Sequence, residues 1–299
     1  MTAPAPTGSR PDDRHPDDRR PSSRRPYGLG RFAACQAALC PATAGLAGPR
    51  PSGVREVVRY NWPMYAAGAL TAAAAGGALA RRLPGPAAAL ARTAAATAAG
   101  YLAVSTLATW CVYDRSELHR YDWLPALLPD GPGDHLVVST GLDEASRPIA
   151  ERHPTAPRRV ADLYDPALTS SGSIRRARRH APPAPGGIPA RPDALPAGTG
   201  ELDTVFAVFA AHELRRPADR TALFTEAARA LRPGGTLLLV EHLRDAANTA
   251  VYGPGAWHFL PRATWLRHAA EAGLHPAAER RIAGLVTAFA FRKPEPCPN

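Results

Sequence analysis

The pattern of apolar and polar positions is clearest over residues 204–242, which read TVFAVFAAHELRRPADRTALFTEAARALRPGGTLLLVEH. Apolar, β-prone residues run without a break over 205–209 and again over 236–240, as in strands that are buried on both faces. Between them, residues 217–231 repeat their apolar positions at helical spacing, and the Arg-Pro-Gly-Gly turn at 232–235 ends that helix. The order strand, helix, strand predicts a βαβ unit and therefore a parallel sheet.

Further apolar runs on both sides extend this sheet. Residues 136–139 and 160–164 predict two earlier strands, and residues 278–282 and 286–292 predict a final antiparallel pair. An amphipathic helix is expected over 261–272. The fold class predicted for residues 134–295 is therefore α/β, a Rossmann-like doubly wound sheet that ends in an antiparallel strand pair.

Two uncharged runs, residues 61–80 and 93–113, precede the predicted sheet. The first has the length needed to span a bilayer, and aromatic residues lie near the ends of both runs, where membrane interfaces favour them. Both runs are rich in alanine rather than leucine, so insertion into a membrane would be driven weakly. The pattern predicts an Ala-rich helical hairpin over 59–115, which either crosses the membrane or packs as a helical pair on the globular domain.

Two segments connect these parts. Residues 1–58 are rich in proline and arginine and have little apolar surface to bury, so a disordered basic tail is expected. Within it, Ser-Arg-Arg-Pro at 23–26 weakly matches a twin-arginine export signal, an alternative to a plain solvated tail. Residues 116–133 are expected to form a linker that lies at a membrane surface or packs on the edge of the sheet.

The positive charge adds little to this picture. The net charge is +10, but Lys293 is the sole lysine, and arginine, alanine and proline are all abundant together, as in a compositionally biased genome. Roughly half of the surplus charge falls in the tail, so no nucleic-acid partner is expected. The four cysteines include no C-x-x-C pair and have no histidine at zinc spacing, which favours unpaired thiols in a reducing compartment.

Two stretches carry a family resemblance. Residues 228–242, ARALRPGGTLLLVEH, resemble the helix, Pro-Gly-Gly turn and fifth strand of class I S-adenosylmethionine-dependent methyltransferases of the type 11-like group. Residues 193–214, DALPAGTGELDTVFAVFAAHEL, resemble the fourth-strand region of the same family, although the Asp-Ala segment meets Leu-Pro at a tighter spacing. The resemblance covers about residues 130–293 and implies S-adenosylmethionine as the cofactor.

The resemblance also implies which residues hold that cofactor. Where the family has G-x-G-x-G after the first strand, this chain has Ser139, Gly141 and Asp143, so only the central glycine is kept. An acidic residue at the end of the second strand would accept hydrogen bonds from the ribose hydroxyls, and Asp162 and Asp165 are both candidates. The adenine side would be served by Asp193 and Ala194.

Catalytic candidates follow the fourth strand. His212 and Glu213 come at its carboxyl end, the edge at which open α/β sheets bind their ligands. His212 has a side chain suited to proton transfer near neutral pH. Glu241 and His242 end the next strand on the same rim, but no H-x-x-x-H spacing is present, and no metal is expected.

These observations predict a methyltransferase that acts on a small-molecule or lipophilic acceptor. Its globular domain would be cytoplasmic and anchored to the cytoplasmic membrane through residues 61–113. The reduced glycine loop leaves an alternative, a non-catalytic membrane-associated module with a methyltransferase fold. A dinucleotide-dependent enzyme is a weaker third reading, against which the Leu-Pro and Pro-Gly-Gly segments argue.

Overall fold

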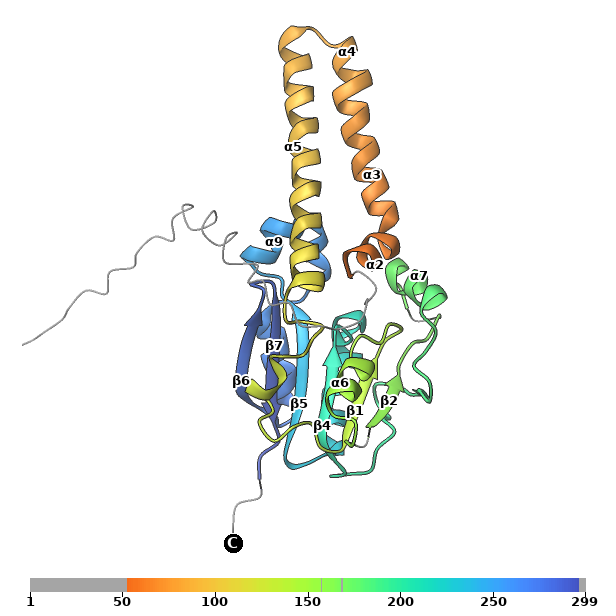
Figure 1. The fold of residues 1–299 in the computed structure, drawn as a ribbon, viewed down its shortest axis with the longest axis vertical. Helices are drawn as coiled ribbons and strands as arrows, with labels where there is room; N and C mark the ends of the chain where they lie inside the picture. The colour runs from red at the N-terminus through yellow and green to blue at the C-terminus, as the bar shows by residue number, and fades with distance from the viewer. Residues whose placement is uncertain (1–52, 157, 168, 296–299) are drawn as a thin grey trace, which may run out of the picture. The chain divides into compact units, whose positions relative to one another are not determined.

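A computed structural model describes residues 53–156, 158–167 and 169–295 (Figure 1). Residues 1–52, and with them most of the predicted tail and the export-signal alternative, lie outside the described residues. Residues 53–58 do not continue the tail as predicted, because they belong to helix α2 (Gly53–Tyr60). The carboxylate of Asp114 accepts hydrogen bonds from the backbone N–H groups of Gly53 and Val54, both at 2.8 Å, and so caps the first turn of α2.

A seven-stranded sheet in the order β3-β2-β1-β4-β5-β7-β6 forms the centre of the globular part. The first five strands in this order are parallel, while β7 pairs antiparallel with β5 and β6 antiparallel with β7. The strands are β1 (His135–Ser139), β2 (Arg158–Asp162), β3 (Ile188–Pro189), β4 (Leu202–Val208), β5 (Leu231–His242), β6 (His275–Ile282) and β7 (Val286–Arg292). The predicted fold class is confirmed.

The predicted βαβ unit is β4, α8 (Pro217–Ala230) and β5. The Pro-Gly-Gly segment is not a turn that precedes the strand, because β5 already begins at Leu231 and the segment bulges between Leu231 and Thr236. The Gly234 N–H donates to the Lys293 carbonyl at 3.0 Å, and the Lys293 N–H donates to Gly235 at 2.9 Å. Pairing with the end of the chain therefore gives these residues the ladder contacts that make them part of a strand.

The two faces of the sheet are covered differently. Helices α8 and α10 (Arg262–Glu271) cover one face with Phe224 and Trp265, which are buried and whose rings lie 6.3 Å apart. The other face is covered by α6 (Ser146–Arg152) and by the 116–133 segment, which includes the short turn η3 (Leu124–Ala126). Trp123 is fully buried there, and its indole N–H donates to the Leu118 carbonyl at 3.0 Å. The segment predicted as a linker is thus part of the core.

The two strands on the β1 side of the sheet, β2 and β3, are short. β2 ends at Asp162 rather than at residue 164, because the Asp162 carboxylate accepts from the Tyr164 N–H at 3.2 Å and starts a turn. β3 has two residues, and the prolines within and around it limit its ladder hydrogen bonds. Helix α7 (Gly172–His180) lies between these strands in sequence and contacts α2.

The Ala-rich segments form the predicted helical hairpin (Figure 1). Its first arm joins α3 (Trp62–Ala73), the π-helical η1 (Ala74–Leu79) and α4 (Ala80–Arg82). Its second arm is α5 (Gly85–Trp110), which continues into η2 (Cys111–Arg115). Within the part of the chain that the structure describes, one helix, Gly85–Arg115, is long and apolar enough to cross a membrane, and 11% of its most apolar window is buried.

The base of the hairpin is attached to the globular part. Helix α5 contacts α9 (Ala246–Tyr252), the helix that follows β5, and α9 leads into the turn η5 (Gly253–His258). At the end of α5, Tyr113 lies against the carboxyl end of β5, where its hydroxyl is 3.0 Å from His242 Nε2. The hairpin thus meets the sheet at the edge where ligands are expected to bind.

Candidate functional site

The carboxyl end of β4 presents His212 and Glu213 to the rim of the sheet. Phe209, directly after the strand, has a φ of 50°, a left-handed conformation that a bulky residue rarely adopts. This conformation turns the chain out of the sheet and into the short turn η4 (Ala211–Glu213). His212 and Glu213, predicted as catalytic residues, therefore stand side by side at the rim.

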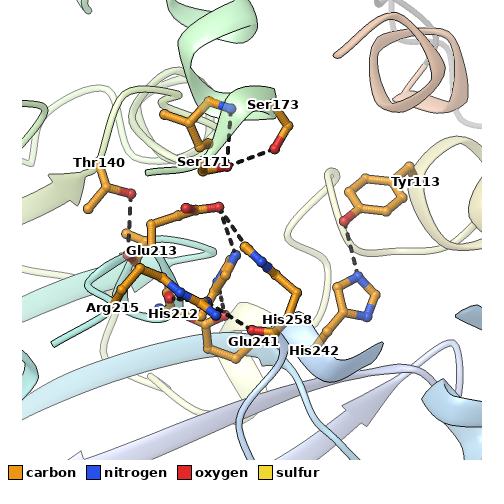
Figure 2. Close-up of polar contacts among 12 residues, drawn as sticks. Tyr113, Thr140, Ser171, Ser173, His212, Glu213, Arg215, Glu241, His242 and His258 are labelled. Carbon is orange, nitrogen blue, oxygen red and sulfur yellow. Dashed lines mark hydrogen bonds and ion pairs between the residues drawn. The ribbon is translucent and has the colours of Figure 1, made fainter. Parts of the chain in front are cut away.

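A cluster of four ionisable side chains forms around His212 (Figure 2). His212 Nδ1 is 2.6 Å from Glu241 Oε2, and His212 Nε2 is 3.4 Å from Glu213 Oε1. His258 Nε2 lies 3.1 Å from the same Glu213 oxygen. Burial alone would lower the pKa of His212, but the negative charges of Glu241 and Glu213 outweigh it and raise that pKa to about 10.

Glu213 shows the opposite shift. Burial raises the pKa of the Glu213 carboxyl, but its hydrogen bonds with His212 and His258 prevail and hold the pKa well below its usual range. Both members of the pair are therefore charged at neutral pH, and His212 holds its proton rather than accepting one.

His242, at the end of β5, is held as a neutral ring. Burial is the main cause that lowers the pKa of His242 to about 4. Its Nδ1 lies 3.1 Å from both Asn248 Oδ1 and the Leu285 carbonyl, so Nδ1 carries the proton and Nε2 accepts from the Tyr113 hydroxyl. The ring also stacks on Phe259, with 4.9 Å between centroids. His242 thus has a structural hydrogen-bonding role, whereas His212 faces the site.

A cavity of about 380 Å³ opens beside the His212 cluster. Its walls come from three parts of the chain: helix α2 and the base of the hairpin, helix α7, and the rim of the sheet. The hairpin side contributes Glu56, Tyr60, Met64, Tyr65, Thr109 and Tyr113, and the rim contributes Glu144, Phe209, His212, Glu213, His242 and His258. This volume falls in the range of small-molecule sites, and the walls are mostly aromatic or apolar with a few charged groups.

The loop after β1 has the glycine turn that the resemblance implies. Gly141 has a φ of 118°, and a Cβ there would lie 2.7 Å from Ile174 and 2.8 Å from Tyr164, so a side chain is excluded. Ser139 accepts from the Gly141 N–H at 3.3 Å. The Asp143 carboxylate accepts from the N–H groups of the first turn of α6, including Ser146 at 2.9 Å, and so caps that helix.

Asp162 and Asp165 are separated by the structure. Asp162 ends β2 next to the loop after β1, where Ser139, Gly141, Asp143 and Asp162 line one small cavity of about 10 Å³. Its carboxylate forms an ion pair with Arg178 of α7. Asp165 is exposed, and its carboxylate accepts from the Ala167 N–H at 2.8 Å in a local turn. Asp162 is therefore the better-placed candidate for the ribose.

The structure does not bring the predicted adenine-side residues to this region. Asp193 is exposed and pairs with the neighbouring Arg191 at 2.6 Å. Ala194 is also exposed and forms an isolated bridge with Arg191. Neither residue lines the two cavities. Their tight spacing to Leu195-Pro196 places them on a surface turn.

The donors at the β1–β2 rim suit S-adenosylmethionine, but the space between them is closed. Gly141 gives a close backbone approach, and Asp162 gives a carboxylate for vicinal hydroxyls. Arg178, Pro182 and Pro183 fill the region in front of them. Helix α7 lies between the small cavity and the large one, since Ile174 and Ala177 line the large cavity and Arg178 the small one. The small cavity of about 10 Å³ is too small for the cofactor in this arrangement, and α7 contributes to its wall.

Sequence reasoning missed three contributions to the site. His258 joins the His212 cluster from η5, a turn in which no site residue was predicted. Tyr113 contacts the rim from η2, which continues α5 at the base of the hairpin. Glu144 lines the large cavity, and burial, followed by the charge of Glu56, raises its pKa to about 8. The one feature of the sequence that could have indicated His258 is its position next to Trp257 in an aromatic loop.

Comparisons with known proteins fit this description. Residues 164–239 match the family model described as a methyltransferase domain. A search of curated proteins finds no match. Solved structures that resemble the chain include S-adenosylmethionine-dependent methyltransferases from Aquifex aeolicus (14% identity, 64% of this chain and 97% of that one, TM-score 0.43) and Methanosarcina mazei (13%, 59% and 99%, 0.42). Human N-acetylserotonin methyltransferase with S-adenosylmethionine gives 16% identity, 65% and 55% coverage and a TM-score of 0.45.

The matched residues, 164–239, run from the turn after β2 through β4 and α8 into β5, the region that carries the resemblance seen in the sequence. The match confirms the predicted family and its cofactor, S-adenosylmethionine, for this domain. The chain therefore carries a class I S-adenosylmethionine-dependent methyltransferase domain.

Proposed function

We propose that this protein is a membrane-anchored methyltransferase that acts on a small lipophilic acceptor. The observation that carries the proposal is the cavity of about 380 Å³, whose walls include both the sheet rim and the base of the hairpin. An acceptor bound there lies beside Glu213 and beneath Met64 and Tyr65 of the hairpin. Apolar and aromatic walls favour a molecule with a substantial apolar part.

The hairpin supports placement at a membrane. Large apolar side chains on it are exposed, including Leu70 at 70% and Leu90 at 73%. Apolar residues occur on all sides of both helices, a pattern typical of helices surrounded by lipid or by other protein. Arginines follow both runs, at Arg81 and Arg115, and suit headgroup positions. A hydrophobic acceptor would then reach the cavity from the bilayer side.

Glu213 is the residue proposed to hold the reactive group of the acceptor. S-adenosylmethionine supplies an electrophilic methyl group when it is bound. His212 is already protonated, so it keeps Glu213 ionised and in place rather than acting as a base. Glu213 Oε2 has no hydrogen-bond partner in the described residues and is free to accept from an O–H or N–H of the acceptor. Positioning and exclusion of water are the main contributions of the site.

Methyl transfer into lipids tests the proposal. The full chain in detergent is incubated with S-adenosylmethionine labelled in its methyl group and with a membrane lipid extract, and label in the organic phase is counted. We expect transfer that falls at least about tenfold in Asp162→Asn, since a carboxylate hydrogen bond contributes about 1.5–3 kcal/mol. Asp165→Asn, which alters the exposed turn carboxylate, is the matched control and should keep wild-type activity.

The second candidate is the non-catalytic module, and the closed space at Asp162 favours it. A folded full chain that neither binds S-adenosylmethionine in calorimetry nor transfers label would support the module and exclude the enzyme. Binding without transfer into any lipid fraction, but with transfer to a water-soluble acceptor, would retain the enzyme and exclude the lipophilic acceptor.

A further inference from the structure

The cluster around Glu213 has the geometry of a metal site. His212, Glu213 and His258 each offer one donor atom, and these atoms all lie within 4.8 Å of one another. The Nε2 atom of His212 lies 3.4 Å from Glu213 Oε1, and the Nε2 atom of His258 lies 3.1 Å from the same oxygen. Zinc bonds of about 2.0–2.1 Å in a tetrahedron place ligand atoms about 3.3 Å apart. The side chains thus already stand near the spacing that an ion would require.

Glu241 orients the first histidine. Its Oε2 lies 2.6 Å from His212 Nδ1, and its Oε1 accepts from the His212 backbone N–H at 3.2 Å. The Glu241 side chain is fully buried. Metal-binding histidines typically donate their second ring N–H to such a carboxylate, which fixes the ring and directs the other nitrogen to the ion. Here that arrangement directs Nε2 of His212 to Glu213 and His258, and a bound cation would replace the proton that this nitrogen carries in its absence.

One carboxylate oxygen in the cluster lacks a partner. The Glu213 side chain is 6% exposed, and its Oε2 is buried with no hydrogen-bond partner among the described residues. A buried carboxylate oxygen without a partner is costly and calls for an explanation. A cation contacted by both oxygens of the Glu213 carboxylate would supply the missing interaction.

Arg215 ties together the two segments that carry the donors. Its guanidinium donates to the carbonyls of His212 and of His258, each at 3.0 Å (Figure 2). The turn after β4 and the turn η5 are therefore held in register by a residue that is not itself a donor. Such pre-arrangement reduces the cost of bringing ligands together on binding.

We propose that His212, Glu213 and His258 form a binding site for a zinc-type divalent cation, positioned by Glu241 and open toward the large cavity. Two imidazoles and one carboxylate are a donor set for zinc or iron rather than for magnesium or calcium, which prefer oxygen. Three protein ligands leave a coordination position free. All three residues line the cavity, so this position faces any molecule bound there.

The free position would take an oxygen, nitrogen or sulfur atom of that molecule. If the proposed methyltransferase function holds, the ion takes over from Glu213 the task of holding the reactive atom of the acceptor. Cation binding itself does not depend on methyl transfer, so the two proposals can fail separately.

Direct binding measurements test the site. The full chain is purified in detergent without a polyhistidine tag, stripped with a chelator, and titrated with ZnCl₂ and with MgCl₂ in a calorimeter. We expect one zinc per chain, far weaker binding of magnesium, and the visible absorption bands of tetrahedral cobalt when Co²⁺ replaces Zn²⁺. His258→Ala should abolish binding, and Glu241→Gln should weaken it by about tenfold to hundredfold.

Two controls keep the result interpretable. His258 is 37% exposed at its side chain, so its replacement should leave the fold intact, which near-UV circular dichroism checks. His275→Ala removes an exposed histidine of β6, and full zinc binding is expected to remain. No saturable zinc binding by the folded wild type would overturn the proposal and leave the cluster as a set of ion pairs. Binding that survives His258→Ala, or equal affinity for magnesium, would also overturn it.

Discussion

Glu144 is held in an unusual protonation state by its surroundings. Burial and then the charge of Glu56 from α2 raise its pKa to about 8, and Asp143 and Glu241 act in the same direction. His212 opposes the shift, and His119 lies 3.9 Å away. Glu144 is therefore largely neutral at neutral pH and can donate a hydrogen bond into the cavity.

This state makes stability depend on pH. Between about pH 4.5, the ordinary value, and about pH 8, the folded chain keeps a proton on Glu144 that the unfolded chain releases. The free energy of unfolding should therefore fall as pH rises through this window and level off above it. The loss should be on the order of 2 kcal/mol, because the side chain is 19% exposed and solvent screens part of the penalty.

Glu144→Gln should remove that pH dependence. Its Tm relative to wild type should rise between pH 5 and pH 9, since glutamine has no proton to lose. Thermal unfolding in detergent at several pH values measures the difference, with the exposed Glu271→Gln as control. A constant difference between wild type and Glu144→Gln across this range would show that the pKa of Glu144 is not raised.

Individual site residues could be predicted from the sequence where they directly follow a clearly marked strand. His212 and Glu213 were found because they directly follow a clear apolar run, and the structure places them together at the rim. Asp162 and Asp165 stayed open because the strand end was uncertain by two residues, and a shift of that size decides which carboxylate faces the loop after β1. His258 comes from 45 residues downstream of Glu213 and depends on how η5 packs, which no local pattern shows.

Helix α7 packs against Asp162 and the loop after β1. Its Arg178 pairs with that carboxylate, and its Ile174 lies over Gly141. The other side of α7 is linked to α2, where Arg176 donates to the Tyr60 carbonyl and the Arg59 guanidinium lies 3.0 Å from His180. The region around Asp162 and the base of the hairpin are therefore connected through one short helix.

Removing the Arg178 side chain should open the site. Arg178→Ala frees the Asp162 carboxylate and is expected to tighten S-adenosylmethionine binding by about tenfold, or about 1.4 kcal/mol, in calorimetry. Arg175→Ala, on the exposed side of the same helix, should leave the Kd unchanged. Weaker binding by Arg178→Ala would instead show that this guanidinium contacts the cofactor.

The junction of α2 with the hairpin depends on Asp114. Its carboxylate caps the first turn of α2 through two hydrogen bonds of 2.8 Å. Asp114→Ala should lower the free energy of unfolding by about 1–2 kcal/mol, the usual cost of losing a helix cap. Chemical denaturation measures this loss, and Asp130→Ala, at an exposed position, should be neutral. An unchanged midpoint for Asp114→Ala would mean that α2 is held by other contacts.

At the level of elements, periodicity predicted the central strands, α8 and α10 to within a few residues. It failed where tertiary pairing decides. The Pro-Gly-Gly segment became part of β5 because it pairs with the end of the chain, and no local signal carries that pairing. The 116–133 segment was read as a linker because its charged residues mask Leu118, Tyr121 and Trp123, which are buried against the sheet.

The molecule as a whole combines a methyltransferase domain with an apolar hairpin, and its attachment to membranes can be measured. The wild type should remain with the membrane pellet after alkaline carbonate extraction. Leu70→Arg places a charge near the middle of the 61–80 run, at a cost of about 3 kcal/mol for insertion, and should shift protein to the supernatant. Leu70→Ala is the apolar control. Recovery of the wild type in the supernatant would instead favour a helical pair that packs on the globular domain without crossing a membrane.

The large cavity, whose walls come from both the hairpin and the sheet rim, has a practical consequence for shortened or altered forms of this protein. A chain shortened to begin at residue 117 would keep the whole sheet but lose Glu56, Met64, Tyr65 and Tyr113, which form one wall of the large cavity. Removal of the apolar hairpin should make the shortened chain more soluble, but it would also open the large cavity to water. If the proposed function holds, mutations of hairpin residues that line this cavity would change both membrane attachment and acceptor preference, so the two properties would have to evolve together.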